Sequence, residues 1–167
     1  MTELPLSSFL IVEDSDEDYA ALERIVRRVR PGLPVHLQRC VSAEQVLMLL
    51  NAPLVPGRPP PELPAVIVLD LNLPGLNGKV VLQAVRQHPR LKRTPVVIFS
   101  TSSNPKDIEW CYEHGANSYH VKQTDYAAFK RAVELLVDYW VEAVRLPPYP
   151  GLQGSLLEKP DGEGKTE

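Results

Sequence analysis

Short segments typical of strands alternate along the chain with longer segments whose apolar residues recur every three or four positions. The predicted strands are Ser8–Glu13, Pro34–Cys40, Ala65–Asp70, Pro95–Ser100 and Asn117–Val121. Most of them are nearly continuous apolar runs, which predicts strands buried on both faces of a parallel sheet. The segment Pro34–Cys40 alternates between apolar and polar residues, as edge strands do.

A helix is predicted after every strand. The predicted helices are Asp16–Arg30, Ala43–Asn51, Gly78–His88, a segment within 104–115, and Asp125–Val144. Ser42 and Asn104 are typical N-caps, and Pro105 suits a first helical position. Five strand–helix pairs predict a doubly wound three-layer α/β sandwich, in which functional sites lie at the carboxyl ends of the strands.

Two segments do not fit this alternation. Residues 51–64 hold six of the 17 prolines, which excludes a helix or a central strand and predicts a stiff surface insertion. Residues 147–167 are rich in Pro and Gly and then polar, which predicts a largely disordered tail. The chain is therefore expected to form one domain over residues 1–146, followed by the tail.

The charge and composition exclude several classes of partner. The net charge is −3, so no basic field favours nucleic acid, and the cluster Arg24, Arg27, Arg28 and Arg30 is interpreted as the solvated face of a helix. No apolar segment has the length of a membrane span, and the N-terminal segment does not resemble a secretion signal. The two cysteines form no CxxC motif and have no His partners, which predicts no structural metal and favours a reducing cytoplasm.

Polar residues stand where four of the predicted strands end. Glu13 and Asp14 end the first, Asp70 the third, Ser100 the fourth, and Lys122 follows the fifth. In a sheet ordered 2-1-3-4-5 these residues meet at one edge. Clustered carboxylates without His or Cys favour Mg²⁺ or Mn²⁺ over zinc. With a lysine and a hydroxyl nearby, the set suits phosphoryl transfer with a carboxylate nucleophile.

Each of these residues also has a purely structural interpretation. Glu13 and Asp14 could cap the following helix, and Asp70 could simply begin a turn. Ser100 could satisfy a backbone group, and Lys122 could be an exposed strand end. We favour the joint interpretation because all of them lie at one edge of the predicted sheet.

Four motifs resemble those of the receiver domains of two-component response regulators. They are VED at Val12–Asp14, VLDLNLPGLNG at Val68–Gly78, VVIFSTS at Val96–Ser102 and GANSYHVKQ at Gly115–Gln123. The resemblance extends from Ser8 to about Val144. It implies the flavodoxin-like fold, with a five-stranded parallel sheet of order 2-1-3-4-5, and a phosphoacceptor rather than an enzyme.

The resemblance also implies roles for Glu13, Asp14 and Asp70, which we call the acidic cluster, and for Asn72. Asp70 matches the phosphoacceptor, Asp14 a direct Mg²⁺ ligand, and Glu13 an acid that acts on the metal through water. Asn72 matches the position whose backbone carbonyl reaches the metal.

Three further positions match the residues that bind and sense the phosphoryl group. Lys122 matches the lysine that contacts it, Ser100 the hydroxyl that turns toward it, and Tyr119 the aromatic residue that rotates with that hydroxyl. Gln123 departs from the family, because a proline, often after a cis peptide bond, usually follows the lysine. We expect a trans bond and a different loop path here.

A narrower resemblance points to the partners. The Pro-rich insertion, RTPVVIFSTS and YWVEAVRLP resemble the single-domain regulators paired with bacterial phytochromes, which implies a photoreceptor histidine kinase as phosphoryl donor.

The last predicted helix carries a stripe of apolar residues that predicts a face packed on the core. Its members are Tyr126, Phe129, Val133, Leu136 and Trp140. Val137, Tyr139, Val141 and Val144 widen the apolar surface, which favours a homodimer through this helix and its neighbours.

Two other functions fit parts of the pattern. A Mg²⁺-dependent phosphohydrolase could use the same carboxylate, although such enzymes usually carry their nucleophile on the first strand in a DxD motif. A flavodoxin-like cofactor binder would need a loop rich in Gly, Ser and Thr after the first strand, and the sequence has Glu13, Asp14 and Ser15 there. A phosphoacceptor accounts for more of the residues than either alternative.

Overall fold

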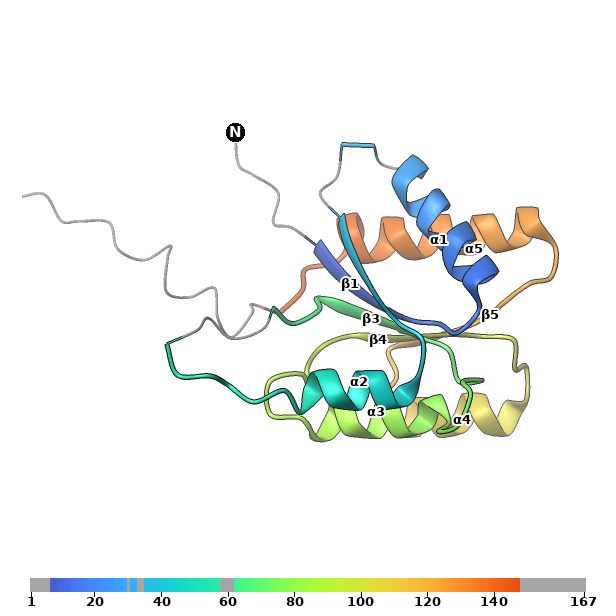
Figure 1. The fold of residues 1–167 in the computed structure, drawn as a ribbon. Helices are drawn as coiled ribbons and strands as arrows, with labels where there is room; N and C mark the ends of the chain where they lie inside the picture. Colours follow the sequence, from blue (N-terminus) through green and yellow to red (C-terminus); the bar gives the residue numbers. More distant parts are fainter. Residues whose placement is uncertain (1–6, 30, 33–34, 58–61, 148–167) are drawn as a thin grey trace, which may run out of the picture.

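Figure 1 shows the computed structural model, which describes residues 7–29, 31–32, 35–57 and 62–147. One parallel sheet has the order β2-β1-β3-β4-β5. Its strands are β1 (Ser7–Val12), β2 (Val35–Cys40), β3 (Val66–Leu69), β4 (Val96–Ser100) and β5 (Ser118–Val121). The helices are α1 (Asp16–Val29), α2 (Ala43–Leu50), α3 (Gly78–Gln87), α4 (Pro105–Glu113), α5 (Tyr126–Asp138) and a π-helical turn, η1 (Tyr139–Ala143). The predicted alternation and sheet order are confirmed.

The sheet lies between two layers of helices. Figure 1 shows α1 and α5 on one face and α2, α3 and α4 on the other. Alternate residues of β1 serve the two faces: Phe9 and Ile11 pack toward α1 and α5, and Leu10 and Val12 toward the opposite layer. Because both faces are covered, β3 and β4 are buried along their whole length, which explains their unbroken apolar sequence.

The predicted caps begin the helices. Ser42 accepts a hydrogen bond from the backbone N–H of Gln45 at the start of α2, and Asn104 accepts one from Lys106 at the start of α4. These side chains satisfy N–H groups that have no partner within the helix. Within the described residues, no helix is long and apolar enough to cross a membrane.

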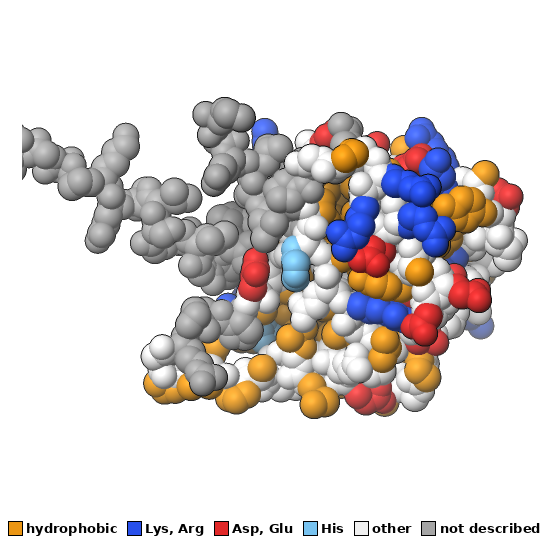
Figure 2. Space-filling model, turned by 45° about the horizontal axis from the view of Figure 1, so that its top comes forward, with side chains coloured by type: hydrophobic (Ala, Val, Ile, Leu, Met, Phe, Trp, Pro, Cys, Tyr) orange, Lys and Arg blue, Asp and Glu red, His pale blue; other side chains and the backbone are white. Residues whose placement is uncertain are grey.

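The face formed by α1 and α5 carries charges of both signs. In Figure 2, Lys and Arg side chains on this face are mixed with Asp and Glu. On α1, Arg24, Arg27 and Arg28 are exposed, and Arg27 pairs with Glu23 at 2.7 Å. This supports the interpretation of a solvated helix face; Arg30 lies outside the described residues.

The last helix differs from the prediction in three ways. It changes from α-helix to the π-helical turn at Tyr139, and Val144 N donates to Tyr139 O at 3.2 Å. Tyr126, predicted in the core, is 51% exposed, because it is the first residue of the helix. Val137, predicted on an outer face, is 2% exposed.

The prediction of a wide exposed apolar face on this helix is therefore wrong in part. Val141 and Val144 also pack against the core cluster. The reason is that α5 packs against α1 as well as against the sheet, so it buries more than one stripe. Tyr139 and Leu135 are the large apolar residues of this helix region, besides Tyr126, that are exposed.

The two segments rich in proline form no regular structure where they are described. Residues 51–57 are exposed, whereas Leu63 and Pro64 are buried beside the start of β3. Residues 58–61 and 148–167 lie outside the described residues, and with them nearly all of the predicted tail.

Gly78 brings the start of α3 against the end of β3. Its N–H donates to Leu71 O at 3.0 Å. A Cβ at this position would collide with the carbonyl oxygen of Asp70 and lie 2.9 Å from the Cα of Leu71. The backbone around Asp70 therefore has room for glycine alone.

Replacing Gly78 with Ala should destabilise the protein, because backbone atoms cannot move aside as a flexible side chain can. We expect Gly78→Ala to lower the free energy of unfolding by about 1–3 kcal/mol in urea denaturation. Gly32→Ala is the control, since a Cβ there meets nothing within 4 Å. Equal stability of the two variants would contradict the close contact.

Candidate functional site

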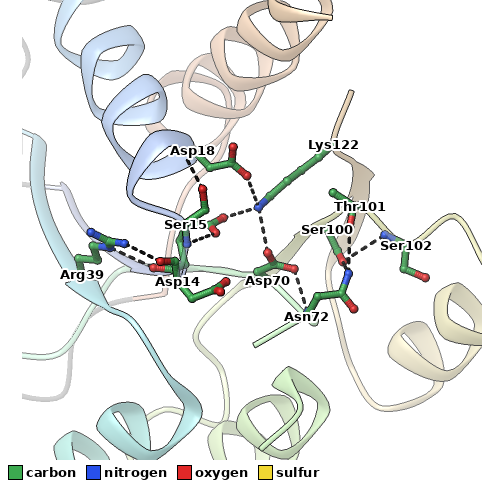
Figure 3. A network of polar contacts seen from close by, with 11 residues as sticks. Asp14, Ser15, Asp18, Arg39, Asp70, Asn72, Ser100, Thr101, Ser102 and Lys122 are labelled. Carbon is green, nitrogen blue, oxygen red and sulfur yellow. Dashed lines mark hydrogen bonds and ion pairs between the residues drawn. The ribbon is translucent and has the colours of Figure 1, made fainter. Parts of the chain in front are cut away.

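Parallel strands deliver polar side chains to one end of the sheet. Glu13 follows β1, Asp70 follows β3, Ser100 ends β4 and Lys122 follows β5. The ladder continues one step past the strands, because Asp70 N donates to Val12 O at 3.0 Å and Lys122 N donates to Ser100 O at 2.8 Å. The sheet therefore fixes the backbone positions of these residues, and Figure 3 shows the side chains of Asp70, Ser100 and Lys122 close to one another.

Three carboxylates meet at this edge, as predicted. Glu13, Asp14 and Asp70 each place an oxygen within 4.8 Å of the others. Glu13 and Asp70 are buried, and Asp14 is exposed. Like charges this close repel one another, so the arrangement favours a cation among them.

Lys122 compensates part of this negative charge. Its ammonium donates to Asp70 Oδ2 at 2.9 Å, to Asp18 Oδ2 at 2.9 Å, and to Glu13 Oε2. The side chain is only 4% exposed. The structural interpretation of Lys122 as an exposed strand end is therefore wrong.

The pKa values reflect the balance between burial and charge. Burial alone lowers the pKa of Lys122, but the hydrogen bond to Glu13 and the charge of Asp70 outweigh it and hold that pKa above its usual value. Burial raises the pKa of Glu13 despite the opposing effect of Lys122. Lys122 is therefore a permanent cation at neutral pH, shared among more acids than it can neutralise.

Both oxygens of Asp70 are oriented by hydrogen bonds. Oδ2 accepts from Lys122, and Oδ1 accepts from the backbone N–H of Asn72 at 3.0 Å. The side-chain amide of Asn72 reaches across to β4, where it donates to Thr101 Oγ1 at 2.9 Å and Ser100 Oγ at 3.4 Å. The loop after β3 is thus tied to the end of β4 (Figure 3).

Ser100 and Tyr119 are connected through Ser102. Ser100 is fully buried, and its Oγ accepts from Ser102 N at 3.3 Å. The hydroxyl of the half-buried Tyr119 donates to Ser102 O at 2.8 Å. The Oγ of Ser102 also donates to Asp107 Oδ2 on α4 at 2.7 Å. Ser102 therefore links the end of β4 to Tyr119 on β5 and to Asp107 on α4.

Two residues of the site were not predicted from the sequence. Asp18, in the first turn of α1, provides the third carboxylate that accepts a hydrogen bond from Lys122. It belongs to the acidic first turn of α1, shortly after the predicted acidic pair in the sequence, which could have revealed it. Arg39, on β2, donates to the backbone carbonyls of Glu13 and Asp14, and no local pattern indicates that contact.

The loop after β5 has the expected trans geometry. Among the described residues there is no cis peptide bond, so the bond between Lys122 and Gln123 is trans. The side chain of Gln123 donates back to Val121 O at 3.2 Å. This departure from the family pattern leaves the side chain of Lys122 in the acidic cluster.

The donor set fits a hard divalent cation. The clustered ligand atoms are carboxylate oxygens of Glu13, Asp14 and Asp70, and no His or Cys belongs to the group among the described residues. Oxygen ligands of this kind suit Mg²⁺ or Mn²⁺. The exposed position of Asp14 gives the group an open side toward solvent.

Known proteins share this fold and are similar to this chain in sequence. The response regulator Rcp1 of Synechocystis sp. is 32% identical over 143 residues, which cover 86% of this chain and 95% of Rcp1. The solved Mn(2+)-bound form of Rcp1 superimposes with a TM-score of 0.72 over 85% of this chain and 99% of that one. The phosphorylated cyanobacterial phytochrome response regulator RcpA gives a TM-score of 0.77 at 27% identity, over 85% and 99% of the two chains.

A third solved response regulator is also similar to this chain. RPA3017, a response regulator in red light signaling of R. palustris, is 30% identical with a TM-score of 0.72, over 86% of this chain and 99% of its own. The family model for the response regulator receiver domain matches residues 9–134, a span that includes β2 to β5, β1 from Phe9 onward, and the acids Glu13, Asp14 and Asp70. The chain belongs to the response regulator receiver domain family.

Proposed function

We propose that Asp70 accepts a phosphoryl group from a histidine kinase. The observation that carries this proposal is one buried carboxylate held between an ammonium and two further acids. An oxygen of Asp70 would form a bond to phosphorus while the bond from phosphorus to the kinase histidine nitrogen breaks. The products are an acyl phosphate on Asp70 and a free imidazole on the kinase.

The neighbours of Asp70 position its carboxylate for this reaction. The N–H of Asn72 holds Oδ1 and the ammonium of Lys122 holds Oδ2, so the group cannot rotate freely. Lys122 is also placed to donate to the oxygens of the incoming phosphoryl group, where negative charge accumulates. The buried hydroxyl of Ser100 is proposed as a further donor to that group.

We place the metal on Asp14 and Asp70 as direct ligands. The backbone carbonyl of Asn72 is proposed as a third ligand, and Glu13 as an acid that acts through water. When bound, Mg²⁺ would neutralise charge on the phosphoryl oxygens. The Mn(2+)-bound structure of Rcp1, a relative of this chain, supports a divalent cation.

The kinase is proposed to be a bacterial phytochrome. RcpA is a phytochrome response regulator, and RPA3017 acts in red light signaling. Each covers at least 85% of this chain, so the likeness includes the last helix.

Ser100 and Tyr119 are proposed as the switch that carries phosphorylation to the surface, with output by protein–protein contact or onward phosphotransfer.

We also propose that a second copy of this chain packs against α4, β5 and α5. Tyr112 and Tyr139 are each at least 50% exposed, and Leu135 is 49% exposed. A groove between β5 and the end of α5 is lined by Ser118 and His120 together with Leu135 and Tyr139. Apolar side chains that remain exposed beside a groove are typical of an interface.

Mg²⁺ should stabilise the folded protein through Asp14. A ligand that binds only the folded state adds about 2.7 kcal/mol at one hundred times its dissociation constant. We expect a gain of this order in urea denaturation with excess MgCl₂, and loss of most of it in Asp14→Asn. Glu17→Gln, which removes an equal charge one turn away, is the control. A gain in Asp14→Asn equal to that of the wild type would refute the proposed metal site.

Phosphorylation should require Asp70. With Mg²⁺ and acetyl phosphate, intact-mass spectrometry should show one added phosphoryl group in the wild type and none in Asp70→Asn. Asp14→Asn keeps the nucleophile, so it should gain the group more slowly. The same three proteins, incubated with an autophosphorylated phytochrome kinase, test the donor. An unmodified wild-type mass with both donors would reject the phosphoacceptor function.

The dimer should depend on the exposed end of α5. We expect light scattering to give a dimer mass for the wild type and a lower mass for the double variant Leu135→Lys, Tyr139→Lys, because charges would be buried without partners. Met48→Lys, at a 74% exposed apolar position on α2, should leave the mass unchanged. A monomeric wild type at all accessible concentrations would exclude the proposed interface.

A further inference from the structure

The turn between β1 and α1 carries two of the three clustered acids on a very short connection. Only Glu13, Asp14 and Ser15 lie between the end of β1 and the start of α1. Glu13 is fixed by burial and by Lys122, but Asp14 is exposed. The direction of the Asp14 carboxylate therefore depends on how the backbone of this turn is held.

One guanidinium holds that backbone from the neighbouring strand. Arg39 Nε donates to Glu13 O at 3.0 Å and Nη2 donates to Asp14 O at 3.2 Å. Nη1 donates to Asp16 Oδ1 at 2.8 Å, and the Cζ atom lies 4.7 Å from the centre of the Tyr19 ring. Figure 3 shows Arg39 on the far side of this turn from Asp70, with its hydrogen bond to the backbone of Asp14.

We propose that Arg39 is a positioning residue for the metal site, and this inference rests on the proposed function. By binding two successive carbonyls it fixes the peptide planes on either side of Asp14, so that the carboxylate faces Asp70. Outer-shell contacts of this kind typically change metal affinity by 10–100-fold when they are removed. Arg39 is not placed to touch the metal itself.

The geometry requires an arginine and not merely a positive charge. The contacts use three different nitrogens of one planar group, in a fork that a single ammonium cannot reproduce. Lysine would keep the charge and lose the simultaneous contacts to both carbonyls. Arg39→Lys therefore separates the positioning role from the charge.

Charge and position act on metal affinity in opposite directions. A cation beside a metal site repels the metal, so removing the charge alone should tighten Mg²⁺ binding. Loss of the two carbonyl contacts should weaken binding, because Asp14 is then free to turn into solvent. The sign of the change in affinity therefore shows which effect dominates.

The test measures Mg²⁺ affinity by calorimetry for the wild type, Arg39→Gln and Arg39→Lys. We expect both variants to bind Mg²⁺ about tenfold more weakly or worse. Arg28→Gln, an exposed arginine on α1, is the charge control and should bind as the wild type does. Tighter binding by Arg39→Gln with unchanged binding by Arg39→Lys would overturn the proposal.

Hydrogen exchange of the metal-free proteins provides a readout independent of the metal. Backbone amides from Asp14 to Tyr19 should exchange faster in both Arg39 variants, while the amides of β3 and β4 remain protected. Unchanged protection of the turn would also overturn the proposal. If the wild type itself binds no Mg²⁺, the proposed metal site fails, whereas equal binding by wild type and Arg39→Lys refutes the role of Arg39 alone.

Discussion

The structure of this site depends on one ammonium shared by three carboxylates. Lys122 contacts Glu13, Asp18 and Asp70, and two of these acids are buried with it. Buried ion pairs contribute little net stability, because desolvation cancels most of their attraction. Since Asp14 adds a further charge nearby, the cluster keeps an excess of negative charge. This excess is the property that makes the pocket receptive to a divalent cation.

The parallel sheet makes such a cluster possible. Strands that all run in one direction end at one edge, so residues far apart in the sequence begin from adjacent points. The turn after β3 then closes tightly, because Gly78 packs against the backbone of Asp70 and Leu71. The backbone of Asp70 is consequently fixed by its packing against Gly78. Its carboxylate is oriented by Asn72 and Lys122.

Local patterns predicted the strands and the helix caps, because each depends on neighbouring residues. The strand order inferred from them then predicted that Glu13, Asp14 and Asp70 meet at one edge of the sheet. The sequence did not indicate the contacts of Arg39, which cross from β2 to the β1–α1 turn, since strand alternation says nothing about which partner a side chain meets. The burial of Val137 was missed for a related reason. It results from the packing of α1 against α5. The pattern of apolar residues along a helix indicates which faces are apolar, but not which neighbouring element covers each face.

We propose that Ser102 connects the chemistry at Asp70 to the surface. It donates to Ser100 through its backbone, accepts from Tyr119 at its carbonyl, and donates to Asp107 through its hydroxyl. A phosphoryl group adds about −1.5 to −2 charges, and a turn of the Ser100 hydroxyl toward it would remove the acceptor of the Ser102 N–H. If Ser102 moved in response, its bonds to Tyr119 and Asp107 would change with it. Because these bonds link β4, β5 and α4, the response would be a change between two arrangements of that surface rather than a local adjustment.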